Sequence, residues 1–362
     1  MPRGYAIDDT SKWTDFKVID FDLKPEEDDD VTIAIECCGV CGSDVHTISG
    51  GWGELAVPAV IPGHEIVGKV TAVGSAVKDM KVGDRVGVGA QVGSCGTCFP
   101  CKGGDEQYCI GDDATGKSMV DTYNSKYVDG SIAQGGYSTA IRAHQQFVFP
   151  IPDGISNEDA ASMLCGGLTV YSPLLRNGAG PGKKVAIVGL GGLGHYAVLF
   201  AVAMGCDVTV ISHSPRKKDD AMKMGAKDFI ATGDEPEWYK RFGRKEQPFD
   251  LIVSTASSNA VDVPSVLSTL TVHGKAVFVG MPEDPLQDLR VQHLAGNGCA
   301  LASSHIGSKV EALKMLKLAD EQKIKPWVEV MPMSQCSIAV KRVHEGDVKY
   351  RFVLQNDFEK KD

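Results

Sequence analysis

The sequence predicts an α/β protein in which a β-rich domain is interrupted by a doubly wound domain with a parallel sheet. Three observations support this fold class. Short strands bounded by turn residues recur over residues 1–155, as in an all-β, barrel-like domain. Strands then alternate with helices, which is typical of βαβ units. The pattern from Trp327 to Leu354 again predicts strands, so we expect the tail to rejoin the first domain.

Length and composition limit the classes of function. The 362 residues suffice for two domains of about 150–200 residues each. A net charge of −10 argues against nucleic-acid or anionic-membrane partners, which require a basic surface. Residues 1–10 lack the apolar core of a secretory signal, and no apolar run reaches the roughly 18 residues of a membrane span. Eleven cysteines without secretion indicate a reducing compartment, by default the cytoplasm.

The first domain is expected at residues 1–157. Strands are predicted at Val31–Ile35, at Glu65–Val73 and, after a turn, at the end of Gly83–Val88. Gly68 lies inside the second of these strands and suggests a bulge or a close backbone contact. The second domain is expected at 158–302, and residues 303–362 should return to the first. A helix should begin near this boundary, because Ser156 is a typical N-cap with Asp159 three residues later.

Four cysteines in the first domain have the spacing of a metal site. They follow the pattern C-x2-C-x2-C-x7-C within fifteen residues, at Cys95, Cys98, Cys101 and Cys109. Four thiolates suit a tetrahedral zinc. A disulfide framework is typical of small secreted domains instead, and an iron–sulfur cluster is the remaining alternative. A zinc with four protein ligands has no open position, so we expect it to stabilise the lobe at 93–112 rather than to take part in chemistry.

Two other polar groups of the first domain call for explanation. The first follows a strand and contains Cys37, Cys38, Cys41, Ser43, Asp44 and His46. The second places His64 beside Glu65 at the start of another strand. Because Cys41 and His64 are 23 positions apart, spacing alone does not join them in one site. Packed or solvated side chains remain the alternative to a second metal centre.

The clearest signal of the second domain is a glycine-rich turn between a strand and a helix. The strand is Lys184–Val188, and a long apolar helix is expected from His195 to Met204. The turn reads G-x-G-x-x-G and consists of Gly189, Leu190, Gly191, Gly192, Leu193 and Gly194. Such glycines let the backbone approach a pyrophosphate at a helix N-terminus. The context therefore predicts a dinucleotide-binding site.

The end of the following strand indicates which dinucleotide is bound. A site for NAD needs a carboxylate there to accept a hydrogen bond from the ribose 2′-hydroxyl. Strand Asp207–Ile211 instead ends at Ser212, His213 and Ser214, with Lys217 close behind. Hydroxyls and cations suit a 2′-phosphate, so NADP is predicted over NAD, with a solvated basic loop as the alternative. Later strands end near Thr255, Val279 and Met281, which are candidate coenzyme contacts.

Together these motifs resemble the zinc-dependent medium-chain alcohol dehydrogenases, and most closely the cinnamyl alcohol dehydrogenase branch with its NADP-dependent fungal members. The resemblance extends from about Gly4 to Leu354. It rests on GVCGSD and His46 in residues 39–46, GHE at 63–65, the four-cysteine lobe, Cys165 within LCGGLTVYSPL, the glycine-rich turn, and the terminal Tyr350-Arg351-Phe352. It implies a GroES-like catalytic domain and a Rossmann domain. One difference is His213, where some NADP-using members carry arginine.

The resemblance implies a catalytic zinc as well as the structural one, hence two zinc ions per chain. Its ligands would be Cys41, His64 and Cys165, with Glu65 as a possible fourth ligand. Two thiolates and one imidazole leave one position open for substrate. Asp44 would orient the ligand histidine. Cys37 and Cys38 are then expected to be packed strand residues.

The resemblance also implies the reaction and its remaining participants. We expect hydride transfer between NADP(H) and primary alcohols or aldehydes (cinnamyl, aromatic or medium-chain aliphatic), with zinc as Lewis acid. Ser43 and His46 would relay the proton, Thr169 would contact the nicotinamide, and Arg351 would pair with the pyrophosphate. A homodimer is expected. Weaker candidates for the wall of the substrate pocket are Trp52, Met119 and Ile306.

Two other functions fit the same scaffold. One is an NAD-linked zinc polyol dehydrogenase, which would prefer NADH to NADPH. The other is a catalytically silent binding protein. The presence of Cys41, His64, Cys165 and Ser43 argues against the silent alternative.

Overall fold

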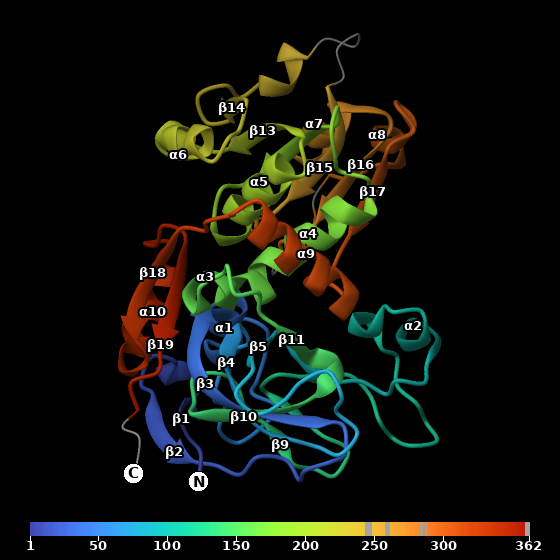
Figure 1. The fold of residues 1–362 in the computed structure, drawn as a ribbon. Coiled ribbons are helices and arrows are strands. Elements are labelled where there is room, and N and C mark those ends of the chain that lie inside the picture. The colour runs from blue at the N-terminus through green and yellow to red at the C-terminus, as the bar shows by residue number, and fades with distance from the viewer. Residues whose placement is uncertain (243–247, 258–260, 283–284, 287, 359–362) are drawn as a thin grey trace. The chain divides into compact units, whose positions relative to one another are not determined.

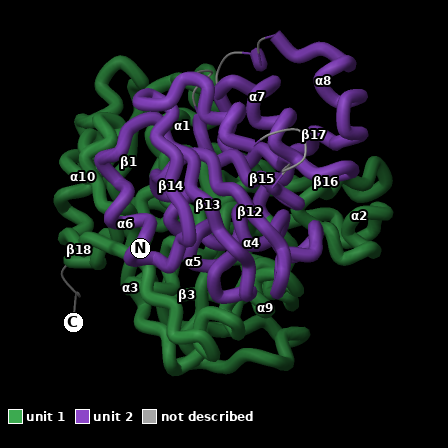
Figure 2. The backbone as a smooth tube through the Cα atoms, turned by 90° about the horizontal axis from the view of Figure 1, so that it is seen from above, with its two compact units in different colours: residues 1–166, 307–362 green, residues 167–306 purple. Residues whose placement is uncertain are grey.

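The computed structural model contains two compact units, which Figure 2 shows in different colours. Unit 1 comprises Met1–Gly166 and Gly307–Asp362, and unit 2 comprises Gly167–Ile306. The breaks lie on the C-terminal side of the boundaries expected from the sequence. The structure describes residues 1–242, 248–257, 261–282, 285–286 and 288–358.

Unit 1 is built on a seven-stranded sheet (Figure 1). Its strands follow the order β11-β5-β4-β3-β19-β18, and β10 also pairs with β3. The C-terminal strand β19 runs antiparallel to β3 and parallel to β18. The strands are β3 (Asp30–Val40), β4 (Ile66–Val73), β5 (Arg85–Val88), β10 (Ala140–His144), β11 (Val148–Pro150), β18 (Val328–Pro332) and β19 (Arg351–Gln355).

Shorter strands and helices complete unit 1. The strands are β1 (Arg3–Ala6), β2 (Lys17–Asp20), β6 (Gln91–Gly93), β7 (Val120–Asp121), β8 (Ser125–Lys126) and β9 (Ile132–Ala133). The helices are α1 (Gly42–Ile48), α2 (Phe99–Lys102), α3 (Asn157–Ala161), α9 (Lys309–Glu321) and α10 (Cys336–His344), while α4 (Gly166–Arg176) begins at the boundary of the units. The 3₁₀ turns of the chain are Thr10–Lys12, Glu106–Tyr108, Gln145–Phe147, Ser162–Leu164, Pro215–Lys217, Trp238–Arg241 and Met333–Gln335.

Local sequence signals account for several of these elements. The Ser156 hydroxyl accepts a hydrogen bond from the Asp159 backbone N–H at 3.1 Å, which confirms the predicted N-cap of α3. A Cβ atom on Gly68 would lie 2.1 Å from the Ala34 carbonyl oxygen of β3. This close contact and the nearby shift in the β3–β4 register explain the glycine inside β4.

The prediction of strands throughout Trp327–Leu354 was wrong for residues 336–344, which form α10. The buried residues of this helix are Cys336, Ala339 and Val340. Their spacing of three and four positions is helical. The β-branched residues around them hid this period in the sequence, because such residues favour strands.

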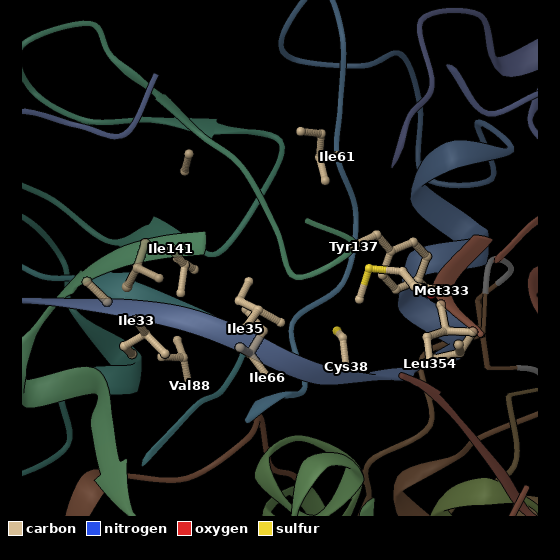
Figure 3. Packing of buried hydrophobic residues seen from close by; sticks show 14 of the residues in the cluster. Ile33, Ile35, Cys38, Ile61, Ile66, Val88, Tyr137, Ile141, Met333 and Leu354 are labelled. Atoms are coloured by element: carbon tan, nitrogen blue, oxygen red, sulfur yellow. The ribbon is translucent and has the colours of Figure 1, made fainter. Parts of the chain in front are cut away.

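The core of unit 1 lies on β3 and its neighbours (Figure 3). Ile33, Ile35 and Cys38 of β3 pack there with Ile66 of β4 and with Leu354 of β19, and each is at most 5% exposed. Figure 3 shows the Cys38 side chain among these apolar groups. Cys37 is also buried, at 2% exposure. Both thiols are therefore packed strand residues, as expected.

Unit 2 has the doubly wound fold that the sequence predicts. Its six parallel strands follow the order β14-β13-β12-β15-β16-β17. Strands β13 and β14 are added on one side of β12 and strands β15 to β17 on the other, so the order of the strands reverses between β12 and β15. Such a reversal creates the position at which doubly wound domains bind ligands. The strands are β12 (Lys184–Val188), β13 (Asp207–Ser212), β14 (Asp228–Ala231), β15 (Phe249–Ser254), β16 (Leu270–Phe278) and β17 (Ala300–Ser303), and the helices are α5 (Gly192–Ala203), α6 (Lys218–Lys223), α7 (Val263–Ser268) and α8 (Val291–Ala295).

The burial of helix α5 explains why its sequence is apolar on all sides. Tyr196, Ala197, Val198, Phe200 and Ala201 are completely buried. A helix with a polar face would leave polar groups against the sheet, so burial on several faces requires the apolar run. In the described part of the chain, no helix has both the length and the apolar character needed to cross a membrane.

Candidate functional site

The four cysteines of the lobe converge as their spacing predicts. Figure 1 shows the lobe with α2 away from the main sheet of unit 1. The Sγ–Sγ distances are 3.4 Å between Cys98 and Cys101, 3.5 Å between Cys109 and Cys95, 3.9 Å between Cys98 and Cys109, and 4.0 Å between Cys95 and Cys101. A disulfide bond is about 2.05 Å long. A tetrahedral ion with bonds of about 2.3 Å to sulfur separates its ligands by about 3.8 Å. The distances therefore fit one tetrahedral ion.

Backbone groups around the lobe support thiolates. The Cys98 N–H donates to Cys95 Sγ at 3.3 Å, and the N–H groups of Cys95 and Gly111 donate to Cys109 Sγ at 3.3 and 3.4 Å. Burial acts to raise the pKa of Cys95, but hydrogen bonds from Thr97 and Cys98 outweigh it and lower that pKa to about 6. Burial instead raises the pKa of Cys101 to about 12 and also raises that of Cys109, so without a metal ion the ionised form is favoured at only part of the lobe.

A second group of metal-binding side chains assembles at one end of the unit 1 sheet. It consists of Cys41, His64, Glu65 and Cys165, whose candidate ligand atoms all lie within 4.8 Å of one another. The antiparallel pairing of β3 with β4 sets Cys38 opposite Ile66. The end of β3 and the start of β4 therefore meet, and this joins Cys41 to His64 across 23 positions. Cys165 follows a 3₁₀ turn and reaches the same place.

The ligand atoms of this buried site are close together and shielded from solvent. His64 Nε2 lies 3.1 Å from Cys165 Sγ. Cys41 and Cys165 are each 7% exposed, and Glu65 is completely buried. The hydrogen bond from Cys165, and then the contacts with His64, hold the pKa of Cys41 well below its usual range although burial opposes them. Cys41 is therefore ready to ionise, and the thiolate is the form that binds metal.

Asp44 fixes the imidazole that faces this site. Its Oδ1 lies 3.0 Å from His64 Nδ1 and accepts from the Gly63 N–H at 3.2 Å. Its Oδ2 accepts from the Cys41 N–H at 2.8 Å, which caps α1. Burial favours the neutral imidazole, but Asp44 and then Cys41 overcome it and raise the pKa of His64 well above its usual range. Asp44 thus leaves Nε2 directed at the cluster, as a residue that orients a ligand histidine does.

Two tyrosines near this carboxylate were not predicted from the sequence. The Tyr137 hydroxyl donates to Asp44 Oδ2 at 3.4 Å. The Tyr123 ring lies with its centroid 5.6 Å from that of His64. Both side chains are buried. They come from loop segments more than 55 positions beyond His64, so no local motif could have indicated them.

Glu65 lies between a cation and the metal-binding atoms. Its Oε1 pairs with the Arg351 guanidinium and accepts from the Gly166 N–H at 3.4 Å. Its Oε2 is buried and has no hydrogen-bond partner among the described residues. Burial is the main cause that raises the pKa of Glu65 to about 7, although Arg351 opposes it. A Cβ atom on Gly39 would lie 2.0 Å from Oε2, so the glycine makes room for the carboxylate.

Arg351 reaches Glu65 because of the strand order. β19 pairs with β3 so that Phe352 lies opposite Val40. Arg351, one residue earlier, consequently lies at the sheet end that carries Cys41, and it is 5% exposed. The sequence predicted Arg351 as a partner of a pyrophosphate. In the structure, Arg351 forms an ion pair with Glu65. A contact between Arg351 and the coenzyme stays a prediction.

The ligand set of the buried site fits a catalytic zinc site. Two thiols and one imidazole match the three protein ligands of a zinc site with an open position. Glu65 offers a carboxylate oxygen within 4.8 Å of the other ligand atoms, and its Oε2 has no hydrogen-bond partner among the described residues. Disulfides do not compete for these sulfurs, since all eleven cysteines are free.

The two residues predicted to relay the proton, Ser43 and His46, both lie on helix α1. Ser43 Oγ lies 3.6 Å from Cys41 Sγ. His46 is three positions further on, and side chains at that spacing share one helix face. The His46 ring stacks on Trp52, with centroids 5.1 Å apart and planes inclined by 13°. Trp52 is 48% exposed, so the stack leads towards solvent.

In unit 2, the glycine-rich turn has the predicted strand–turn–helix form. No side chain caps α5, whose N-cap is Gly191. A Cβ atom on Gly191 would meet no atom within 4 Å, whereas one on Gly194 would lie 2.1 Å from the Gly189 carbonyl oxygen. Gly194 thus permits close packing, and Gly191 leaves open space beside uncapped N–H groups. This is the arrangement that accepts a pyrophosphate.

Two other predicted residues contact this turn. The Thr255 hydroxyl, after β15, lies 3.0 Å from the carbonyl oxygens of both Val188 and Gly189. The Lys217 ammonium donates to the Leu190 carbonyl at 2.7 Å. The Ile211 carbonyl accepts from the Gly189 N–H at 2.8 Å, so the end of β13 with Ser212 also lies at the turn.

The remaining predicted residues lie elsewhere. Val279 follows β16 and is buried, and its N–H donates to Ser254 at 2.9 Å, whereas Met281 is 45% exposed. Thr169 is in the first turn of α4 and is 8% exposed. Met119 is half-buried before β7 in unit 1, and Ile306 is buried at the end of unit 2. Roles for these five residues in binding stay predictions.

Comparison with known proteins gives matches over the whole chain. Residues 27–153 match the alcohol dehydrogenase GroES-like domain family, and residues 192–321 match the zinc-binding dehydrogenase family. The chain is 45% identical to NADP-dependent alcohol dehydrogenase 6 of Saccharomyces cerevisiae over 356 residues, which cover 97% of this chain and 96% of that relative.

Solved structures agree with these matches. A cinnamyl alcohol dehydrogenase from Sorghum bicolor superposes with a TM-score of 0.90 at 37% identity and covers 100% of both chains. A CAD from Helicobacter pylori, complexed with NADP(H), superposes with a TM-score of 0.86 at 34% identity, covering 98% of this chain and 97% of that one. The predicted fold class is confirmed.

Proposed function

The chain belongs to the zinc-binding alcohol dehydrogenases, on the branch similar to cinnamyl alcohol dehydrogenases, and we propose that Cys41, His64 and Cys165 hold its catalytic zinc. The protein is an NADP-dependent alcohol dehydrogenase that interconverts alcohols and aldehydes. The observation that carries the assignment is the convergence of two thiols and one imidazole in a buried site. Such a set leaves an ion one position for the oxygen of a substrate.

Zinc held by Cys41, His64 and Cys165 would supply Lewis-acid polarisation of the oxygen of the alcohol or aldehyde, and NADP(H) held by unit 2 would take up or supply the hydride. The contacts of Asp44 support its role in holding the His64 ring, and the free Oε2 of Glu65 supports a further, exchangeable ligand to the ion.

Ser43 and His46 move the proton. When an aldehyde is reduced, its oxygen must gain a proton, and when an alcohol is oxidised, it must lose one. The Ser43 hydroxyl can both donate and accept, and it lies 3.6 Å from the Cys41 sulfur. His46 then exchanges the proton with solvent, since the ring nitrogens of an imidazole can both donate and accept a proton. Trp52 holds the His46 ring by stacking.

Unit 2 binds the coenzyme through the glycine-rich turn. The N–H groups at the start of α5 would face the pyrophosphate, and Gly191 leaves the space for it. Ser212, His213, Ser214 and Lys217 follow β13, where the ribose 2′-phosphate is expected. The absence of a carboxylate from residues 212–218 supports NADP over NAD.

We propose reduction of cinnamyl, aromatic and medium-chain aliphatic aldehydes as the main activity. The experiment is steady-state NADPH oxidation with cinnamaldehyde, benzaldehyde and hexanal. We expect turnover of all three, with kcat/KM for NADPH well above that for NADH. A preference for NADH together with polyols would favour the polyol dehydrogenase alternative. No NADPH oxidation with any aldehyde by zinc-loaded protein would favour a silent binding protein.

We also propose two zinc ions per chain, the second one in the lobe of Cys95, Cys98, Cys101 and Cys109. The sulfur separations of 3.4–4.0 Å support a closed tetrahedral site there. Its role is to hold the lobe together. The eleven free cysteines, eight of which are buried, further support a reducing compartment such as the cytoplasm.

A homodimer is supported by the edge of the unit 2 sheet. β17 is the outer strand, beyond β16, and its Ala300 and Ala302 are exposed. The exposed Val272 of β16 lies in the same part of the sheet. Exposed edge strands pair readily with a second copy, and a twofold axis would continue the sheet. We expect light scattering to give a dimer, and the double variant Ala300→Lys/Ala302→Lys to give a monomer. A monomeric wild type would contradict the proposal.

A further inference from the structure

The backbone that leads to His64, the imidazole of the buried site, is closely held. The Gly136 N–H donates to the Gly63 carbonyl at 2.7 Å. A Cβ atom on Gly135 would lie 2.5 Å from the same carbonyl oxygen, so the two segments lie directly against each other. The place of the His64 backbone is therefore set by the fold of unit 1, and what remains to be fixed is the orientation of its ring.

The plane of the His64 ring needs more than its carboxylate partner. The torsion that turns a histidine ring about its Cβ–Cγ bond has broad minima, so the side chain does not select one plane by itself. Asp44 contacts a single ring atom, Nδ1, at 3.0 Å. A ring held at one atom can still tilt about that contact, and tilting turns the Nε2 lone pair away from the sulfurs of Cys41 and Cys165.

Tyr123 packs against the imidazole and limits this tilt. The centroids of the two rings lie 5.6 Å apart, and their planes are inclined by 31°. Aromatic rings that contact each other have centroids about 4.5–7 Å apart. Both residues are buried, with His64 at 4% and Tyr123 at 8% exposure. An imidazole that tilted towards this side would collide with the tyrosine ring.

Apolar side chains keep the Tyr123 ring in its place. Val57 and Val60 form a small apolar cluster with it, separate from the main core of unit 1. Both valines are at most 4% exposed. They belong to the loop that ends at His64. The same loop therefore carries the metal ligand and part of the packing around the tyrosine.

The residues on either side of Tyr123 are anchored as well. The Thr122 hydroxyl donates to the Gly89 carbonyl at 2.6 Å. Asn124 Oδ1 accepts from the Ala56 N–H at 2.8 Å. These two contacts fix the backbone before and after the tyrosine. A side chain with fixed backbone and close packing can constrain its neighbour, because it cannot easily move aside.

The hydroxyl end of Tyr123 lies near the carboxylate that holds the same imidazole. Burial, followed by the charge of Asp44, raises the pKa of Tyr123 well above its usual range, although a hydrogen bond with Thr47 opposes this. The hydroxyl therefore keeps its proton and can donate to Asp44. One side chain thus meets the ligand ring with its own ring, and the partner of that ligand with its hydroxyl.

We propose that Tyr123 is a positioning residue for the metal ligand His64: its ring holds the plane of the imidazole, so that Nε2 points at the sulfurs of Cys41 and Cys165 before an ion is bound. This inference rests on the catalytic zinc site proposed above. The alternative is an ordinary core residue, whose loss would lower stability without changing how the site binds metal.

The experiment measures the binding of Co²⁺ to zinc-free protein, because the visible spectrum of this ion depends on the type and geometry of its ligands. The four-sulfur lobe contributes the same spectrum in every variant, so differences between variants arise at the buried site. Competition with a chelator gives the affinity. Turnover is not needed, so a change in coenzyme or substrate binding does not enter the result.

Two variants separate the ring from the hydroxyl. Tyr123→Leu removes the flat ring and keeps an apolar side chain. We expect the affinity of the buried site for Co²⁺ to fall about tenfold, as is typical when a residue that orients a metal ligand is lost, and the spectrum of that site to change. Tyr123→Phe loses only the hydroxyl, so it should keep the wild-type spectrum and most of the affinity.

Tyr127→Leu is the matched control. This tyrosine lies on the same segment as Tyr123, is half-buried and packs against the main core of unit 1. Its replacement removes a ring of the same size away from the imidazole. The urea midpoint should fall, while the Co²⁺ affinity and spectrum of the buried site should equal those of the wild type.

The outcomes separate this inference from the function it rests on. A folded Tyr123→Leu protein with wild-type affinity and spectrum would overturn the inference and leave the zinc site intact, as would equal losses in Tyr123→Leu and Tyr123→Phe. If Tyr123→Leu does not fold, Tyr123→Met fills more of the space without a ring and must show both changes. A wild-type protein that binds Co²⁺ at the lobe alone would overturn the proposed catalytic site together with the inference.

Discussion

The two cysteine-containing sites of unit 1 differ in how the chain builds them. The lobe takes four sulfurs from fifteen consecutive residues, three of them from partly exposed cysteines. The buried site takes Cys41, His64, Glu65 and Cys165 from three separate segments that meet at one sheet end. A local site can form as a loop closes, whereas the buried one exists only when β3 and β4 are in register. The first should therefore affect stability, and the second activity.

The surroundings differ in the same way. Backbone N–H groups approach the lobe sulfurs and satisfy them. Charged side chains surround the buried site, with Asp44 behind the imidazole and Arg351 behind the carboxylate. Arg351 pairs with one carboxylate oxygen of Glu65, and the other oxygen has no hydrogen-bond partner among the described residues. A closed structural site needs no such adjustable oxygen, and a site that exchanges substrate can use one.

Removing a ligand of the buried site should have the largest effect. We expect Cys165→Ala to lower kcat by about 10³-fold or more, since metal polarisation contributes several kcal/mol to such reactions. Cys37→Ala, another buried cysteine of unit 1, is the matched control and should keep most activity. Steady-state kinetics with cinnamaldehyde and circular dichroism provide the measurement. A folded Cys165→Ala with wild-type kcat would refute the ligand assignment.

Breaking the buried ion pair should come next. Arg351→Met leaves the Glu65 carboxylate buried without its cation, which typically costs about 3–5 kcal/mol. Urea unfolding measures this loss. The double variant Glu65→Met/Arg351→Met removes both charges and should be more stable than Arg351→Met alone. If the loss of unfolding free energy in the double variant equals the sum of the losses in Glu65→Met and Arg351→Met, the two charges are not coupled.

Opening the lobe should cost less and leave the chemistry intact. Cys109→Ala removes one of the four proposed ligands that would close a fifteen-residue loop, and closure of such a loop contributes about 3 kcal/mol. The urea midpoint should fall accordingly. The kcat of the folded fraction should stay within about twofold of the wild type, because the buried site has its own residues. A loss of kcat as large as in Cys165→Ala would contradict the separation of the two sites.

Asp44→Asn tests the support of the imidazole. Residues that orient metal ligands typically contribute 10–100-fold in metal affinity or activity, so we expect a loss within about that range. The matched change is Tyr137→Phe, which removes a longer contact of 3.4 Å to the same carboxylate and should have less effect. Metal competition with a chelator gives the affinity. Equal effects of the two changes would mean that His64 is not held by Asp44.

The smallest effect is expected at the His46–Trp52 stack. Trp52→Ala should lower kcat about two- to tenfold, the magnitude of one aromatic or cation–π contact at an exposed position. Trp52→Phe keeps an aromatic ring and should recover most of the loss. The pH profile of kcat separates a proton-transfer defect from a change in substrate binding. A change confined to KM would assign Trp52 to the substrate pocket instead.

Sequence reasoning succeeded where the physical signal is local. The lobe, the glycine-rich turn and the Ser156 cap each lie within about fifteen residues and were predicted in form. The α10 helix was predicted as strand because its β-branched residues hid the helical spacing of Cys336, Ala339 and Val340.

Contacts across the sheet could not be predicted in this way. The pairing of Arg351 with Glu65 depends on the register of β19 against β3, and Tyr137 reaches Asp44 across 93 positions. The family resemblance predicted that Cys41, His64 and Cys165 belong to one site. It did not supply the cation beside Glu65, since Arg351 was expected at the pyrophosphate.

The most direct test of the account is the number of metal ions in the two cysteine variants, measured with activity on the same samples. By elemental analysis we expect two zinc ions per wild-type chain and one in each of Cys165→Ala and Cys109→Ala, with activity lost only in Cys165→Ala. A Cys165→Ala protein that keeps both ions and its activity, or a folded Cys109→Ala protein that loses activity with its single ion, would contradict the division between the buried site and the lobe.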